Sequence, residues 1–420
     1  MNLHIKGGRV IDPASGRDAL GDVFVSDGKM VEALKGKAEK TIDAKGLVVC
    51  PGFIDLAARL REPGGEYKAT LESEMDAAVA GGVTSLACPP DTDPPLDEPG
   101  LVDMLRRRAK ALARARVYPV GALTMKLEGE NLTEMSLLAE AGCVAFSQAN
   151  VPLADNQVLW RALQYAATFG FPVWLHAEDA SLARGGVAHD GEVATRLGLP
   201  GIPPFAETIA ISVILELVRA TRARVHLCRL STAGGVELVR AAKREGLPVS
   251  CDVGIHHVHL SDMDLGYFDS NCRLVPPLRS QRDRDALARG LAEGVIDCAC
   301  SDHTPVDEDG KHLPFAEAEP GATGLELLLP LTLKWGAAAK LPLAVTLARI
   351  TSDPARILGV ASGRLAPGAP GDVAVFDPAA ALRIVPEALK SQGKNTPFIG
   401  YELAGRVRYT VVAGNVVFEG

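Results

Sequence analysis

The sequence lacks three features that would each have pointed to a particular class of function. It has no charge-free apolar run of about 18 residues, so we expect no membrane-spanning helix. Its eight cysteines include no Cys-x-x-Cys pair of the kind that binds zinc or exchanges disulfides. It also lacks an excess of positive charge. The net charge of -8 opposes nonspecific binding to nucleic acid or to an anionic membrane, although a local basic patch is compatible with it.

The amino-terminal segment and the cysteines predict where the protein works. Residues 1–7 contain no long apolar run of the kind found in secretion signals. The cysteines lie mostly inside apolar runs such as residues 296–300, which is typical of buried, reduced thiols. We therefore expect a cytoplasmic protein.

The middle of the chain predicts an α/β barrel. With 47% hydrophobic and 23% charged residues, the 420-residue chain can bury a sizeable core. Short apolar segments, each followed by a helical pattern, occur at 48–56, 83–88, 116–122, 142–147, 171–176, 224–230, 247–253 and 295–301. Eight strands buried on both faces and alternating with helices is the number that closes a parallel barrel. We expect a (β/α)8 TIM-type barrel over residues 48–362, with helices such as 101–115 and 209–218 outside.

The two ends of the chain predict a second, smaller domain. Residues 2–11 and 21–33 alternate in β fashion around a turn at Asp27-Gly28, and residues 371–377 and 405–419 show the same pattern. We expect residues 1–47 and 363–420 to pair into a small β-sandwich.

Several motifs along the chain carry a family resemblance. The segment 51–64, Pro-Gly-Phe-Ile-Asp-Leu-Ala-Ala-Arg-Leu-Arg-Glu-Pro-Gly, resembles the first-strand signature of the dihydroorotases, a family of cyclic amidohydrolases. Residues 185–203 resemble the loop after the fifth strand, and Gly324-Leu325-Glu326 resembles a later turn. Residues 352–355 and 394–400 fit the end of the same fold, so the resemblance extends over nearly the whole chain.

The resemblance implies a zinc site at the carboxyl ends of the barrel strands, but most of its ligand positions are changed. The first-strand His-x-His pair falls on Ala57 and Arg59, and the sixth-strand histidine falls on Arg229. The fifth-strand histidine and the eighth-strand acid are kept as His176 and Asp302. Two ligands are fewer than the three that a catalytic zinc normally takes from protein, so we expect no bound metal and only vestiges of the catalytic site.

The bridging acid and the substrate contacts implied by the family are also altered. The acid falls at or beside Gln148, whereas Arg61 fits the arginine that binds the substrate carboxylate. Asp91 stands where an asparagine is expected, and Val275 and Val306 replace polar positions. Valine cannot hydrogen-bond a substrate, and we expect Asp91 to repel an anionic one.

A physical hypothesis connects these replacements. Without metal, Asp302 would be a buried carboxylate with no counter-charge, which is costly. We expect Arg59 or Arg229, or both, to form a salt bridge with it and to fill the former metal volume. The residues have other interpretations: His176 as a polar core residue, the two arginines as an anion pocket, and His256, His257 and His259 as a replacement metal site.

These features lead to contrasting functional hypotheses. The leading one is a non-catalytic dihydroorotase homologue of pyrimidine biosynthesis, because the missing ligands resemble those of the inactive dihydroorotase-like subunits that support assembly of bacterial aspartate carbamoyltransferase. The alternative is an active, zinc-dependent hydrolase of a cyclic amide with a rearranged site. A third is a sensor that binds a small anion such as carbamoyl aspartate. We also expect an oligomer, since two-fold symmetric assembly is common.

Overall fold

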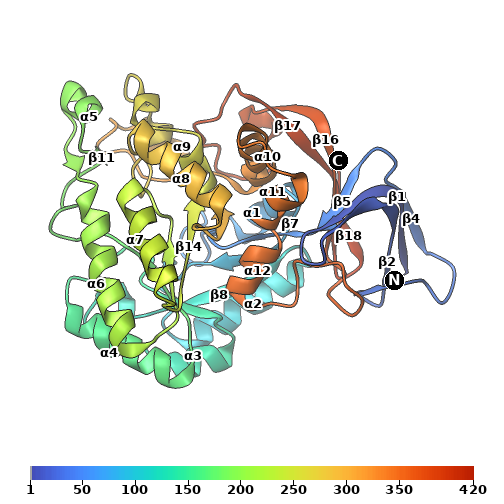
Figure 1. Ribbon diagram of the computed structural model, residues 1–420, viewed down its shortest axis with the longest axis horizontal. Coiled ribbons are helices and arrows are strands. Elements are labelled where there is room, and N and C mark those ends of the chain that lie inside the picture. Colours follow the sequence, from blue (N-terminus) through green and yellow to red (C-terminus); the bar gives the residue numbers. More distant parts are fainter. Residues whose placement is uncertain (1) are drawn as a thin grey trace.

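The computed structural model describes residues 2–420 and places a parallel barrel beside a second sheet (Figure 1). Neighbouring barrel strands pair in parallel and in chain order. The eight strands are β6 (Phe53–Asp55), β7 (Val83–Cys88), β8 (Arg116–Ala122), β9 (Ala145–Ser147), β10 (Val173–His176), β13 (Val225–Cys228), β14 (Val249–Gly254) and β15 (Cys298–Cys300). The first and last strands meet just beyond their ends through a parallel bridge between Ala58 and His303, which nearly closes the barrel.

Helices cover the outside of the barrel, as the sequence predicted (Figure 1). The longer ones are α1 (Leu71–Ala80), α2 (Pro99–Leu112), α4 (Asn156–Phe169), α6 (Phe205–Thr221), α7 (Ala233–Arg244), α8 (Gln281–Glu293) and α10 (Leu328–Ala338). The shorter ones are α3 (Met135–Ala141), α5 (Glu192–Leu197), α9 (Glu308–His312), α11 (Leu343–Ala348) and α12 (Ser352–Leu358). A serine or threonine hydroxyl caps the amino terminus of several of these helices. At the start of α1, for example, the Thr70 side chain accepts a hydrogen bond from the Ser73 backbone N–H.

The two ends of the chain combine into one sheet, as expected from their β pattern. Its strands are β1 (Leu3–Asp12), β2 (Arg17–Ser26), β3 (Lys29–Val31), β4 (Lys40–Asp43), β5 (Val48–Pro51), β16 (Val373–Arg383), β17 (Glu402–Val412) and β18 (Asn415–Glu419). All eight are hydrogen-bonded into a single continuous sheet, where we expected a sandwich. A hydrophobic cluster containing Leu3, Val25 and Val373 joins residues from both ends of the chain.

The segment 48–56 differs from its prediction as one barrel strand. Residues 48–51 form β5, which pairs with β1 and β16 in the terminal sheet, and only residues 53–55 join the barrel as β6. Gly52 separates the two strands, and a Cβ there would come within 2.2 Å of the Thr84 side chain. A glycine is therefore needed where the chain passes this close to β7.

The eight cysteines are all free, and every one except the partly exposed Cys228 is buried, in line with the expectation of reduced thiols. Across residues 2–420, no helix is both long enough and apolar enough to cross a bilayer.

Candidate functional site at the barrel mouth

The predicted site residues come from the ends of different barrel strands. Arg59 follows β6, His176 ends β10, Arg229 follows β13 and Asp302 follows β15. The carboxyl ends of parallel strands meet at one face of the barrel, where enzymes of this architecture place their catalytic groups. These four residues therefore lie together at the mouth of the barrel.

Arg59, Arg229 and Asp302 form a buried ion-pair cluster, as hypothesised. Arg229 Nη1 lies 2.9 Å from Asp302 Oδ1, and Arg59 Nη1 lies 3.4 Å from the same oxygen. The Arg59 Nε atom also lies 2.7 Å from Asp91 Oδ2. Two guanidinium groups thus face two carboxylates, so the formal charges of this cluster cancel.

Opposing effects determine the pKa values of the two acids in the cluster. Burial would raise the pKa of the Asp302 carboxyl, but the positive charges of Arg229 and Arg59 outweigh it and hold the pKa below its usual value. Burial and the charges of Arg59 and Arg61 oppose each other at Asp91 in the same way, and its pKa is also lowered. Both groups are therefore carboxylates at neutral pH, and the charge of Asp91 is balanced instead of standing free to repel a ligand.

The backbone holds the cluster in an uncommon conformation. Arg229 and Asp302 have φ values of 53° and 46°, in the left-handed region that non-glycine residues seldom adopt. The Arg229 N–H donates to Asp252 Oδ1 at 2.6 Å, and the Arg229 guanidinium reaches Asn150 Oδ1 through Nη2 at 2.5 Å. These bonds fix the orientation of Arg229 toward Asp302.

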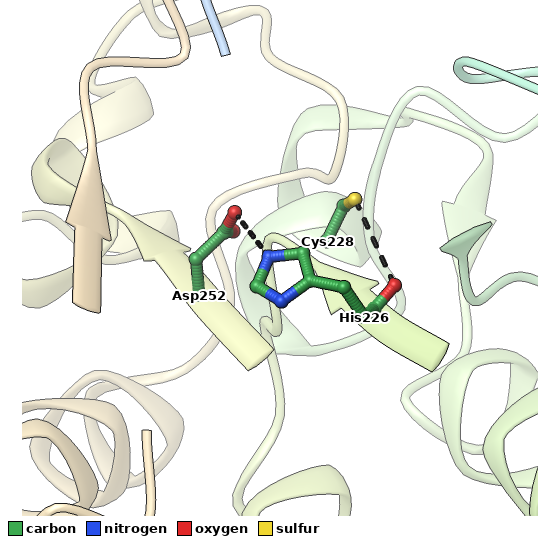
Figure 2. Close-up of side chains that lie close together, drawn as sticks. All are labelled: His226, Cys228 and Asp252. Carbon is green, nitrogen blue, oxygen red and sulfur yellow. Dashed lines mark hydrogen bonds and ion pairs between the residues drawn. The ribbon is translucent and has the colours of Figure 1, made fainter. Parts of the chain in front are cut away.

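A second network lies beside the cluster and was missed from the sequence (Figure 2). His226, Cys228 and Asp252 place potential ligand atoms within 4.8 Å of one another. His226 already pairs through Nε2 with Asp252 Oδ2 at 2.9 Å and through Nδ1 with Ser250 Oγ at 2.8 Å. Burial raises the pKa of the Cys228 thiol, which disfavours the thiolate that a metal requires. The trio therefore fits a satisfied hydrogen-bond network that supports Arg229 through Asp252, and not a metal centre.

The sequence contains part of the information that predicts this network, namely the spacing of His226 and Cys228, but it does not show which strand lies beside them. His226 and Cys228 are two residues apart on β13, so they point to the same face of the strand. Asp252 lies on β14, where the register pairs His226 with Ser250. Only the strand register brings these side chains together.

His176 lies near the cluster without joining it. Within residues 2–420, neither ring nitrogen has a hydrogen-bond partner of normal geometry, and Nε2 is 4.0 Å from Glu178 Oε2. Burial and the nearby charge of Arg229 lower the pKa of His176 to about 3, so the ring is neutral. It lines a cavity of about 220 Å³ together with Gln148 and Glu178.

The other predicted site residues, Gln148, Arg61 and Ala57, are not part of the ion-pair cluster. The Gln148 amide accepts from Thr124 Oγ1 at 3.0 Å and donates to the Leu127 carbonyl at 2.8 Å. Arg61 Nε donates to the Pro305 carbonyl at 2.8 Å. The buried Ala57 offers only a methyl group. Among residues 2–420, neither Gln148 nor Arg61 forms a hydrogen bond or an ion pair with the Asp302 carboxylate.

The side chains of the three histidines at 256–259 have different partners. His256 and His257 lie in a 3-10 turn that follows β14. His257 Nε2 contacts the Pro276 carbonyl at 3.0 Å, and His259 Nε2 contacts the Leu331 carbonyl at 2.9 Å. His256 Nε2 is 3.9 Å from Asp302 Oδ2. With two of the rings bonded to different backbone carbonyls, this segment does not fit a replacement metal site.

The residues at the mouth also do not fit the zinc that the family fold implies. Asp302, which matches a ligand position of the family, pairs through Oδ1 with the guanidinium groups of Arg59 and Arg229. Ala57 has no donor atom, and a guanidinium stays protonated and repels a dication. No chemical step is therefore assigned to a metal here.

Comparisons with known proteins agree with this architecture. A family model described as "Dihydro-orotase-like" matches residues 46–234, and one described as "Amidohydrolase family" matches residues 207–418. A "dihydroorotase-like protein" from Pseudomonas aeruginosa is 45% identical over the full length of both chains. A "dihydroorotase" from Geobacter sp. is 42% identical, again over both full lengths. Among solved structures, an L-hydantoinase (dihydropyrimidinase) from Arthrobacter aurescens superimposes with a TM-score of 0.88 at 25% identity, covering 99% of this chain and 96% of the other.

Proposed function

The chain belongs to the dihydroorotase-like amidohydrolase family, and from that premise we propose that it is a non-catalytic member of the family. In this proposal its fold serves as an assembly partner of aspartate carbamoyltransferase in the cytoplasm. The proposal has two parts, the loss of catalysis and the identity of the partner, and each has its own support.

The ion-pair cluster at the barrel mouth carries the first part. Arg59 and Arg229 lie 3.4 and 2.9 Å from the carboxylate that the family fold would give to a metal. The side chains of Arg59, Arg229 and Asp302 are no more than 6% exposed, so the partners of Asp302 are the guanidinium groups and not bulk solvent. With Asp302 held by two guanidinium groups, the position that the family gives to a metal ligand is already paired, which supports a loss of metal-dependent hydrolysis.

The second part is supported by family resemblance. The chain lacks the ligands at positions 57, 59 and 229, a pattern similar to that of inactive dihydroorotase-like subunits associated with aspartate carbamoyltransferase. A fold that has lost its chemistry can still provide a rigid surface for a partner.

Reconstitution tests the partner. The aspartate carbamoyltransferase chain of the same organism is purified alone and together with this protein, and its mass is measured by light scattering alongside its transferase activity. We expect a stable mixed complex and a gain in transferase assembly or activity. A transferase that assembles and works normally without this protein, and does not bind it, would contradict the proposal.

An active hydrolase of a cyclic amide is the second candidate. It is favoured by His176, whose ring nitrogens lack partners of normal geometry in the described chain and which lines a cavity with Glu178. Similarity to a hydantoinase fold supports the same reaction class. Bound zinc and zinc-dependent turnover of a cyclic ureide would favour this candidate, whereas a metal-free, inactive protein would favour the first.

A further inference from the structure

Helix α2 carries a concentrated positive charge that the site at the barrel mouth does not use. Six arginine and lysine residues occur within residues 106–116, in a chain whose net charge is -8. Arg106, Arg107 and Lys110 are exposed, and their spacing of three and four residues places them on one face of the helix. This face is the local basic patch that the overall composition left open.

Several neighbouring cations are already neutralised. Arg108 lies 2.8 Å from Glu62, Arg114 lies 2.6 Å from Asp76, and Arg116 lies 3.0 Å from Asp372. Arg106, Arg107 and Lys110 are different.

These three have no carboxylate partner within 4.0 Å anywhere in residues 2–420, and Arg106 donates only to the neutral Ala141 carbonyl. The exposed face of α2 therefore keeps a net positive charge. One acid, Asp103, also lines the groove beside this face of α2, so three cations stand against one carboxylate there.

A groove runs beside this face. It has a volume of about 590 Å³ and lies between α2, the start of β8 and the turn between β17 and β18. Small apolar side chains line much of it: Ala109, Ala113, Ala115, Val117, Val412 and Ala413. The groove thus combines apolar lining with a cationic edge.

We propose that this groove docks an acidic segment of the partner protein, with apolar side chains of that segment against the lining and carboxylates beside Arg106, Arg107 and Lys110. The inference rests on the proposed assembly function and assigns a surface to it. An acidic partner fits because the three cations have no ion-pair partner in the described residues of an otherwise acidic protein, and complementary charge accelerates and orients association. A peptide segment fits because a small inorganic anion would leave the apolar lining uncovered.

Charge reversal on α2 tests the docking surface. The double variant Arg107→Glu/Lys110→Glu is compared with Arg282→Glu/Arg289→Glu, which reverses two exposed arginines on α8 that have no ion pair within the described residues. Binding of the purified aspartate carbamoyltransferase chain is measured by calorimetry at about 0.05 and about 0.5 M NaCl. We expect the α2 variant to raise Kd by about tenfold or more at low salt and to lose most of the salt dependence, with the α8 control unchanged.

Each other outcome is decisive. If the wild type binds the transferase chain and the α2 variant binds it with the same Kd, the groove is not the docking surface. No binding by the wild type would instead remove the partner proposed above, and the groove proposal with it. Light scattering that shows a self-association abolished in the α2 variant, with transferase binding intact, would identify a second copy of this chain as the occupant and overturn the inference. The milder Arg107→Gln/Lys110→Gln variant covers the case in which charge reversal impairs folding.

Discussion

Replacing Asp302 with asparagine measures the role of the ion-pair cluster. Asparagine keeps the shape of aspartate and tolerates the left-handed backbone at this position, where φ is 46°, so the substitution removes mainly the charge. If the cluster is structural, the change leaves Arg59 and Arg229 buried with two positive charges opposed only by Asp91. The protein should therefore become less stable.

The size of the loss follows from the contacts. Breaking a buried ion pair by removing one partner costs about 3–5 kcal/mol. The lower end applies here, because Arg59 keeps its bond to Asp91 and Arg229 keeps its bond to Asn150. An unfolding entropy of about 2.1 cal/mol/K per residue makes 1 kcal/mol equal to about 1 °C for a chain of this length. A loss of about 3 kcal/mol should therefore lower Tm by about 3–4 °C.

Urea unfolding of a double-mutant cycle provides the assay. The variants are Asp302→Asn, Arg229→Met and both together, and the cycle isolates the coupling between the two side chains. A structural pair predicts a coupling of about 2 kcal/mol or more. An Asp302→Asn protein as stable as the wild type, or more stable, would refute the reasoning, because residues kept for catalysis commonly reduce stability.

Three more predictions concern the metal, a buried network and pH. The triple substitution Ala57→His/Arg59→His/Arg229→His restores the missing donors and should yield a protein that copurifies with zinc, as measured by elemental analysis, while the wild type does not. The substitution Glu74→Gln should lower the free energy of unfolding by about 2–3 kcal/mol in urea, because the carboxylate accepts several buried hydrogen bonds, including one at 2.6 Å from His303. Burial lowers the pKa of His176 to about 3, so its contribution to stability should disappear as pH falls from about 6.5 toward that value.

The unfolded chain binds a proton at His176 below about pH 6.5, while the folded protein excludes it, so stability falls with decreasing pH by at most about 1.4 kcal/mol per pH unit. Thermal melts at several pH values should show a weaker loss in His176→Asn. An unchanged profile would contradict the buried, neutral state, and His312→Asn, at a side chain that is 70% exposed, serves as the control.

The Glu74 and zinc predictions have their own controls. Glu72→Gln changes an exposed acid on the same helix and should leave stability nearly unchanged. Equal losses in the two glutamate variants would argue against the buried network. If wild-type protein and the triple variant carried the same amount of zinc, the metal would be bound elsewhere and the missing-ligand argument would fail.

The bounds of a barrel strand could be predicted from the sequence where a short apolar run is flanked by turn residues and followed by a helix. Strands β7 and β8 occupy the predicted residues 83–88 and 116–122. The prediction was wrong for residues 48–51, because an apolar run buried on both faces looks the same in either sheet. Which neighbours such a strand pairs with depends on distant parts of the chain, here β1 and β16.

The sequence predicted the centre of the ion-pair cluster but not the residues that surround it. The meeting of Arg59, Arg229 and Asp302 followed from their places at strand ends and from the cost of leaving a buried charge unpaired. The roles of Asp91 and Asp252 did not follow. Asp91 was expected to repel a ligand, yet it balances Arg59, and Asp252 holds the Arg229 backbone through a contact across adjacent strands. Side-chain direction and lateral register decide both contacts.

We propose that the barrel mouth has exchanged metal-dependent chemistry for the ion-pair cluster of Arg59, Arg229 and Asp302. The most direct test is dihydroorotase turnover by the purified protein in the hydrolytic and cyclising directions, with and without added zinc, beside an Asp302→Ala variant. We predict that the wild type shows no turnover above the background of the variant under any of these conditions. Zinc-dependent turnover that disappears in Asp302→Ala would contradict the claim and would show that Asp302 still works in catalysis.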